Sequence, residues 1–260
     1  MALKSFSKFY YGHRVTDENC YIDFDEGNGP LVATLNPGSY TLTEFVNEIA
    51  RAMGNAGLQD YSASLDRKTR QVTISATDNF TLLFNSGSNK SYGAIGLIGF
   101  TSDNDLTGAN SYQSPNGSGG EFKPQMWLQK YTPFENFQES IGATKSTSSS
   151  GVVEIVTFGE IRKMECVISH ATNKPIGFLA QWEQDLSGVE NFRSFLHDAC
   201  VKGGRLEFMP DRDDEDNFYK CILESSPGYK EGTGFKLTEL FSQKLPDFFK
   251  FGPLVFREVK

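Results

Sequence analysis

A run of six consecutive charged residues, DRDDED at positions 211–216, is the first candidate for chemistry. An EF-hand calcium loop beginning at Asp211 would require glycine at its sixth position and glutamate at its twelfth, where this chain has Asp216 and Ile222. Paired catalytic carboxylates usually come from separate elements rather than from one exposed turn. Pro210 precedes the run, and apolar residues alternate on both sides of it, which indicates the connection of a hairpin. We therefore predict a solvated connection that at most contacts a basic partner or an ion through its carboxylates: Asp211, Asp213, Asp214, Glu215 and Asp216.

The remaining reactive side chains are scattered along the chain. The three histidines fall in different expected elements and show neither HExxH nor HxH spacing, which a shared metal would need: His13, His170 and His197. The four cysteines form no CxxC pair and lie within apolar patterns, which favours buried thiols: Cys20, Cys166, Cys200 and Cys221. Cys200 and His197 would be neighbours on a helix, but no third residue is placed to orient the histidine as a base.

Glycine motifs give no nucleotide or nucleophile site either. The stretch GAIGLIGF at 93–100 does not have the order GxGxxG, and GxxxxGK[ST] and GxSxG are absent from the chain. The sequence therefore predicts no catalytic residue, no cofactor, no metal ligand and no enzymatic activity.

Composition narrows the class of protein. The chain has 260 residues, of which 38% are hydrophobic and 22% charged, as in soluble globular proteins with one large or two modest domains. The formal net charge of −8 argues against nucleic acid as the main partner, because phosphate binding needs clustered Lys and Arg. The nearest approach to such a cluster, Arg67, Lys68 and Arg70, is expected to be a solvated turn. No signal peptide and no apolar run long enough for a membrane span are expected.

The first half of the chain predicts a small sheet with one helix across it. Thr41 and Glu44 form a capping box, Phe45, Ile49 and Met53 follow at helical spacing, and Gly54 and Gly57 are expected to stop the helix. The expected elements are a hairpin of 21–26 and 31–36, this helix, a second hairpin of 61–66 and 71–76, and a further strand at 79–84. Residues 101–121 and 143–151 are polar and without period, and they are predicted to be a linker or long surface loops.

The second half predicts more strands and one helix. The capping box of Ser187 and Glu190 begins a helix that stops near Gly203. Strands are expected at 152–158, 161–169, 178–184, 205–210, 218–224 and 252–259, with a short helix at 236–245. The predicted fold class is mainly β with a few helices (α+β). A hairpin–helix–hairpin module (1–110) is followed by a linker with long loops (111–151), then by a β-sandwich or barrel with one flanking helix (152–260).

Residues of about 20–108 resemble a known module. The motifs are ATLxPGxYT before the helix, YxxSxDxxTxxxTIS and FxLL in the strands, and a closing GFxxDxDxTG. Together they resemble a module found in structural proteins of tailed-bacteriophage virions. The later text "FLAQWEQDLSGVENFRSFLHDACVKGGRLEFMPDRDDEDNFYKCILE" is similar to tail proteins of the tail-tube and distal-tail group.

This resemblance implies a structural role without chemistry. Proteins of this group build rings around the tail channel, so the resemblance implies a virion tail or baseplate subunit, assembled in the host cytoplasm. Its partners would be copies of itself, in a ring of hexameric symmetry, and other tail proteins. Neither a membrane nor sequence-specific nucleic acid is expected as a partner.

Two alternatives remain open. The chain could be a neck or capsid-attached decoration protein, or its first module could bind a glycan or receptor. Besides the acidic run, the candidate contact residues between subunits or with a receptor are Tyr112, Trp127 and Tyr131. A peptidoglycan hydrolase is disfavoured, because it would need a carboxylate or Cys–His site that the sequence does not offer.

Overall fold

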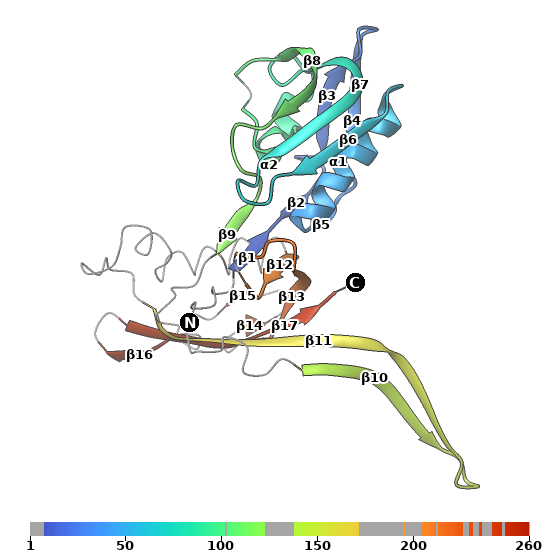
Figure 1. Ribbon diagram of the computed structural model, residues 1–260, viewed down its shortest axis with the longest axis vertical. Helices are drawn as coiled ribbons and strands as arrows, with labels where there is room; N and C mark the ends of the chain where they lie inside the picture. Colours follow the sequence, from blue (N-terminus) through green and yellow to red (C-terminus); the bar gives the residue numbers. More distant parts are fainter. Residues whose placement is uncertain are drawn as a thin grey trace.

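The computed structural model describes residues 8–101, 103–122, 138–171, 195, 204–211, 213–225, 229–230, 234–235, 241–245 and 248–259. Within these residues the protein is mainly β, with antiparallel sheets and two α-helices, which confirms the predicted α+β class. Figure 1 shows two bodies, a helix-bearing module and a second body of strands, from which a long hairpin projects.

The helix-bearing module contains the elements between residues 12 and 119. In chain order they are β2 (His13–Val15), β3 (Tyr21–Asp25), β4 (Pro30–Thr34), β5 (Gly38–Tyr40), α1 (Leu42–Ala56), β6 (Tyr61–Leu65), β7 (Val72–Leu82), η1 (Lys90–Tyr92), α2 (Ile95–Ile98) and β8 (Leu106–Gln113). Five strands form one sheet in the order β4-β3-β7-β6, with β8 also paired to β7, and β2 pairs with β5 separately. Both predicted hairpins, β3–β4 and β6–β7, are confirmed.

Helix α1 begins as its capping box predicts. Thr41 Oγ1 accepts a hydrogen bond from the Glu44 N–H at 3.2 Å, and Glu44 Oε2 accepts one from the Thr41 N–H at 3.0 Å. The helix continues through Gly54 and ends at Ala56, where the Gly57 N–H bonds to the Met53 carbonyl. Its apolar face, including Phe45, lies in the buried core of the module. Burial of each large apolar side chain contributes about 1.5–3 kcal/mol, which holds the helix on the sheet.

The second body is built on an eight-stranded antiparallel sheet. Its strands are β1 (Lys8–Tyr11), β9 (Gly120–Phe122), β10 (Gln138–Thr147), β11 (Val153–Ala171), β12 (Leu206–Met209), β13 (Tyr219–Ser225), β16 (Phe241–Leu245) and β17 (Phe248–Glu258). The order is β10-β11-β17-β13-β12-β1-β9, with β16 also paired to β17, and β14 (Tyr229–Lys230) and β15 (Gly234–Phe235) form a separate ribbon. The predicted strand pair around the acidic run, β12–β13, and the closing strand are confirmed.

Several predicted elements are wrong. The strand expected at 79–84 is the end of the longer strand β7. The two strands expected at 152–158 and 161–169 are one strand, β11, because Gly159 lies opposite Gly142 at a β-bulge rather than in a turn. The predicted loops at 101–121 and 143–151 contain β8, β9 and the end of β10, since backbone pairing does not require apolar alternation. Residues 241–245 of the predicted short helix are strand β16. The expected strand at 178–184 and most of the helix after Ser187 lie outside the described residues.

The helix-bearing module is inserted into the sheet. Strands β1 and β9 are antiparallel neighbours, with Phe9 opposite Phe122 and Tyr11 opposite Gly120, so residues 12–119 stand where a hairpin turn would otherwise join them. Phe9 is 1% exposed, and its ring centroid lies 4.9 Å from that of Phe256. The start of the chain therefore completes the core of the sheet that the end of the chain forms.

Candidate functional surfaces: the module junction and the β10–β11 arm

The acidic run connects β12 to β13, as predicted, but its residues do not share one environment. Asp213, Asp214 and Asp216 are exposed, and Asp211 Oδ1 accepts a hydrogen bond from the Asp213 N–H at 2.9 Å. Glu215 differs, because its side chain is only 14% exposed and its carboxylate lies 2.6 Å from Lys8 Nζ. The prediction of a solvated connection is therefore wrong for Glu215.

Lys8 is a buried cation on β1. Its side chain is 3% exposed, and its ammonium group donates to Tyr10 Oη at 2.8 Å as well as to Glu215. Tyr10 Oη in turn donates to the Arg67 carbonyl at 2.6 Å, which ties the sheet to the β6–β7 turn of the module. Burial, reinforced by the nearby carboxylates of Glu121 and Glu215, raises the pKa of Tyr10 above its ordinary value, so the phenol stays a neutral donor.

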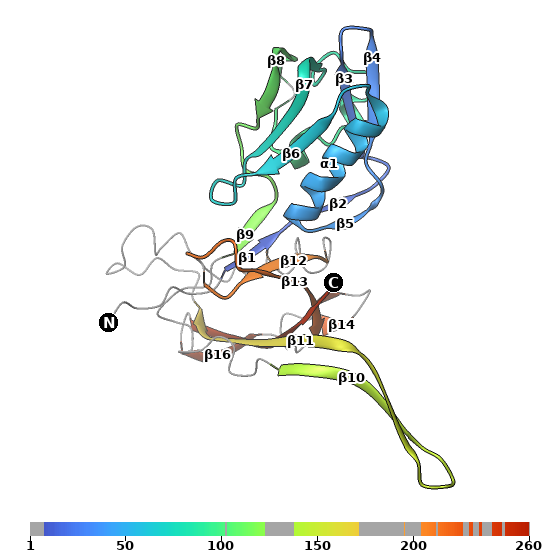
Figure 2. The same ribbon diagram turned by 45° about the vertical axis from the view of Figure 1, so that its right-hand side comes forward.

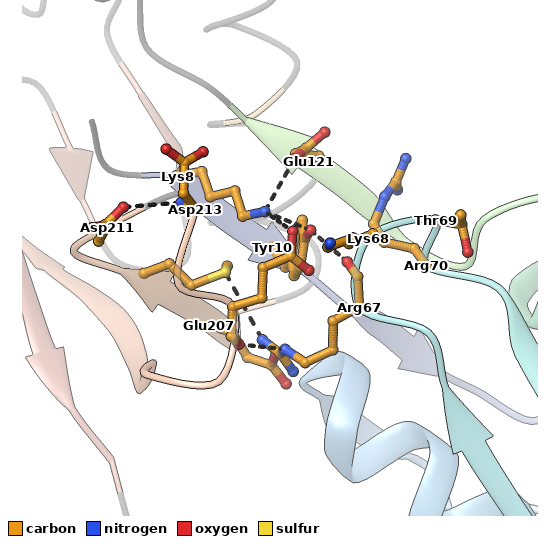
Figure 3. A network of polar contacts seen from close by, with 12 residues as sticks. Lys8, Tyr10, Arg67, Lys68, Thr69, Arg70, Glu121, Glu207, Asp211 and Asp213 are labelled. Carbon is orange, nitrogen blue, oxygen red and sulfur yellow. Dashed lines mark hydrogen bonds and ion pairs between the residues drawn. The ribbon is translucent and has the colours of Figure 1, made fainter. Parts of the chain in front are cut away.

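Arg67 reaches from the β6–β7 turn of the module to β12 and to the acidic run (Figure 3). Its Nε donates to the Glu215 carbonyl at 2.6 Å, and its guanidinium lies 2.9 Å from the Glu207 carboxylate and 4.1 Å from the ring centre of Phe218. Glu207 is fully buried and also accepts a hydrogen bond from the Thr43 N–H at 2.9 Å. The predicted solvated turn at 67–70 is thus wrong for Arg67, which lies between α1, β12 and the acidic run.

A second set of ion pairs joins the start of α1 to the sheet with the opposite polarity. Glu44 lies 3.0 Å from the Arg205 guanidinium and 3.1 Å from Lys220 Nζ. Burial opposes ionisation of this carboxyl, but the Thr41 N–H and the two cations outweigh it and lower the pKa of Glu44 below its usual range. The contact surface between the module and the sheet is called the junction below. Its buried apolar residues are Tyr10, Leu42 and Met209. Its charged residues are Lys8, Glu44, Arg67, Arg205, Glu207, Glu215 and Lys220.

The hairpin β10–β11 is the other notable surface, called the arm below. Strand β11 pairs with β17 from Lys163 onward, whereas residues 153–162 pair only with β10 within the described part of the chain. Ten residues of strand span about 33 Å, and in both views the arm runs away from the two bodies (Figures 1 and 2). At its tip Val152 is 65% and Val153 48% exposed.

The other predicted site residues have ordinary places where they are described. Tyr112 is buried in the module, where its hydroxyl donates to the Phe80 carbonyl at 2.7 Å, which does not fit an exposed contact. Trp127 and Tyr131 lie outside the described residues. Cys20 and Cys221 are buried, as predicted. The described residues contain no group of three or more His, Cys, Asp or Glu side chains able to hold a metal ion.

No protein-family model matches the sequence, and a search of curated proteins finds no match. Among the described helices, none is both long and apolar enough to cross a membrane.

The sequence contains a pattern of charges that points to the junction. The acidic run and the basic turn at 67–70 carry opposite charges, and each connects two strands. Complementary charge on two hairpin connections would have suggested that they meet. In the arm, β11 was predicted as two strands, whereas β10 was not predicted, because its sequence QESIGATKST contains few alternating apolar residues.

Proposed function

We propose that the chain is a structural subunit of a tailed-phage virion, in the tail or baseplate, that acts through contacts between copies of itself. The main support for this proposal is the exposed backbone of the arm. A two-stranded ribbon is marginally stable in water on its own, and the outer half of this one pairs with no third strand among the described residues. Packing on a neighbouring subunit would supply the missing stabilisation.

The tip of the arm supports the same role. Two adjacent valines are solvent-exposed there, on a turn held by hydrogen bonds between the Ser148 N–H and the Val152 carbonyl and between Ser148 Oγ and the Val152 N–H. An ordered turn that presents apolar side chains suits insertion into another surface. Strand β10 also has one free edge among the described residues, which is a template for strand pairing with another chain.

The resemblance of residues 20–108 and of the later half to phage structural proteins narrows the class to virion subunits. Contacts that repeat head to tail generate closed rings when the rotation closes. A hexameric tail or baseplate ring is accordingly the specific form of the proposal.

The test compares assembly with and without the arm. Residues 144–156 are replaced by Asn-Gly, a two-residue turn that joins the register pair Ala143 and Thr157. Mass by light scattering over a range of protein concentrations, together with electron microscopy, should show a discrete oligomer or ring for the unaltered chain and a folded monomer for the variant.

A milder pair of variants separates the arm from general surface effects. Val152→Ser with Val153→Ser should weaken assembly, whereas Val32→Ser, which alters a valine that is 40% exposed on β4 of the module, should not. A chain that stays monomeric at every concentration, or that assembles equally well without the arm, would contradict the proposal. A monomer or trimer that retains glycans would favour the receptor-binding alternative instead.

A further inference from the structure

The attachment of the module to the sheet is narrow. The chain crosses between them only twice within the described residues, at 11–13 and 113–120, and both crossings lie at the adjacent strands β1 and β9. The apolar part of the junction is small: the buried side chains are Tyr10, Leu42 and Met209, with Leu65 and Phe218 partly buried beside them. Small, polar contacts between domains leave their relative orientation free to change unless specific interactions fix it.

The ion pairs of the junction have alternating polarity. The module contributes the cation Arg67 opposite Glu207 of β12, and it contributes the anion Glu44 opposite Arg205 and Lys220 of the sheet. A module rotated on its attachment would bring like charges together at these positions. Charge patterns of this kind fix register and orientation more than they add affinity.

We propose that the junction is an electrostatic latch that holds the module in one orientation on the sheet, and that the module pivots on its two crossings when either set of ion pairs is broken, Arg67 with Glu207 or Glu44 with Arg205 and Lys220. This inference goes beyond the proposed role in assembly and does not depend on it. The decisive member is Glu207, because it is fully buried and contacts the module through the Thr43 N–H and Arg67. Without Arg67 it would be a buried, uncompensated charge, and lifting the module would return it to water.

Removing both charges of the Arg67–Glu207 pair should close the latch again. Buried ion pairs can often be replaced by apolar residues of similar volume without loss of stability, because the cost lies in desolvating a charge. Arg67→Met alone should therefore open the junction, and Arg67→Met with Glu207→Met should restore the closed orientation. Lys68→Met is the matched control, since Lys68 carries the same charge in the same turn but is exposed.

The experiment measures the distance between the two bodies in the full chain. Spin labels on unnatural amino acids at Asn47 of α1 and Arg257 of β17, both exposed, leave the native cysteines untouched. Pulsed electron paramagnetic resonance should give one narrow distance distribution for the parent and for Lys68→Met. Arg67→Met should shift and broaden it, and the double variant should narrow it again. An unchanged distribution in Arg67→Met, or a double variant as broad as the single one, would overturn the latch.

A second variant covers the case in which Arg67→Met does not fold, as judged by circular dichroism. Glu44→Gln keeps an oxygen for the capping hydrogen bond to the Thr41 N–H but removes the charge that faces Arg205 and Lys220. It should shift the distance distribution in the same direction. A folded Glu44→Gln protein with the parent distribution would refute the proposal.

Discussion

Protonation of His13 should destabilise the base of the module in mildly acidic solution. The imidazole packs on Phe45, with ring centres 4.6 Å apart, and its Nε2 lies 2.9 Å from Ser118 Oγ. Since Ser118 Oγ donates to the Leu97 carbonyl at 2.7 Å, Nε2 of the neutral ring must donate to Ser118. Burial lowers the pKa of His13 from 6.5 to about 4, against a smaller opposing effect of the Leu97 carbonyl.

The direction and size of this stability change follow from the difference in proton binding between the folded and unfolded chains. The unfolded histidine titrates near its ordinary pKa and the folded one lower, so the stabilisation is complete above about pH 6.5 and is lost as the pH falls toward 4. At about 1.4 kcal/mol for each pKa unit, the maximum loss is about 3 kcal/mol, of which about 2 kcal/mol is lost by about pH 5. His13 keeps some contact with solvent, so these are upper values.

The assay is urea unfolding of the parent and of His13→Gln between about pH 7.5 and pH 5, above the range in which most carboxylates titrate. Gln can still donate to Ser118 but does not titrate, so the parent should lose about 2 kcal/mol more than the variant over this range. The difference between the two proteins cancels the titration of His170 and His197. Equal pH dependence in both, or an NMR titration that gives His13 a pKa near 6.5, would contradict a destabilising protonation of the buried imidazole.

Two further predictions concern the backbone of the module. Thr41→Ala removes the side-chain cap of α1 and should lower the free energy of unfolding, measured in urea titrations, by about 1 kcal/mol. An unchanged urea midpoint would contradict a stabilising role of the Thr41 side chain. Gly12→Ala should destabilise the protein far more, because a Cβ at Gly12 would meet the Tyr40 carbonyl oxygen. Gly54→Ala is the control: a Cβ there meets no atom, and alanine should stabilise α1 by about 0.5–1 kcal/mol, seen as a higher melting temperature. Equal effects of the two substitutions would contradict the close packing of Gly12.

The module could be predicted from the sequence because its signals are local. A capping box fixes where α1 begins, and alternating residues on both sides of short turns fix the two hairpins. These features involve residues only a few positions apart, and their energetics do not depend on the rest of the chain. The continuity of β7 and β11 was missed because a polar or glycine residue within a long strand looks the same in sequence as the end of one.

The insertion could not be predicted, because it rests on pairing between distant segments. Strand β1 is four residues long and pairs with β12, roughly two hundred positions later, where Lys8 lies opposite Met209. Nothing local to those four residues states which strand they join. The same holds for Arg67, whose partners Glu207 and Glu215 come from the other end of the chain.

If the chain assembles as we propose, the contacts of Glu215 limit how a second copy could use the acidic run. One carboxylate of the acidic run is bound to Lys8 inside the chain, and its backbone carbonyl is bound to Arg67. Because these contacts hold the connection against the module, a neighbouring subunit that used the run would have to bind it without displacing them. The backbone of the outer arm carries no such constraint, since residues 153–162 pair only with β10 among the described strands. In the assembly that we propose, contacts between subunits are therefore expected to involve the arm rather than the acidic run.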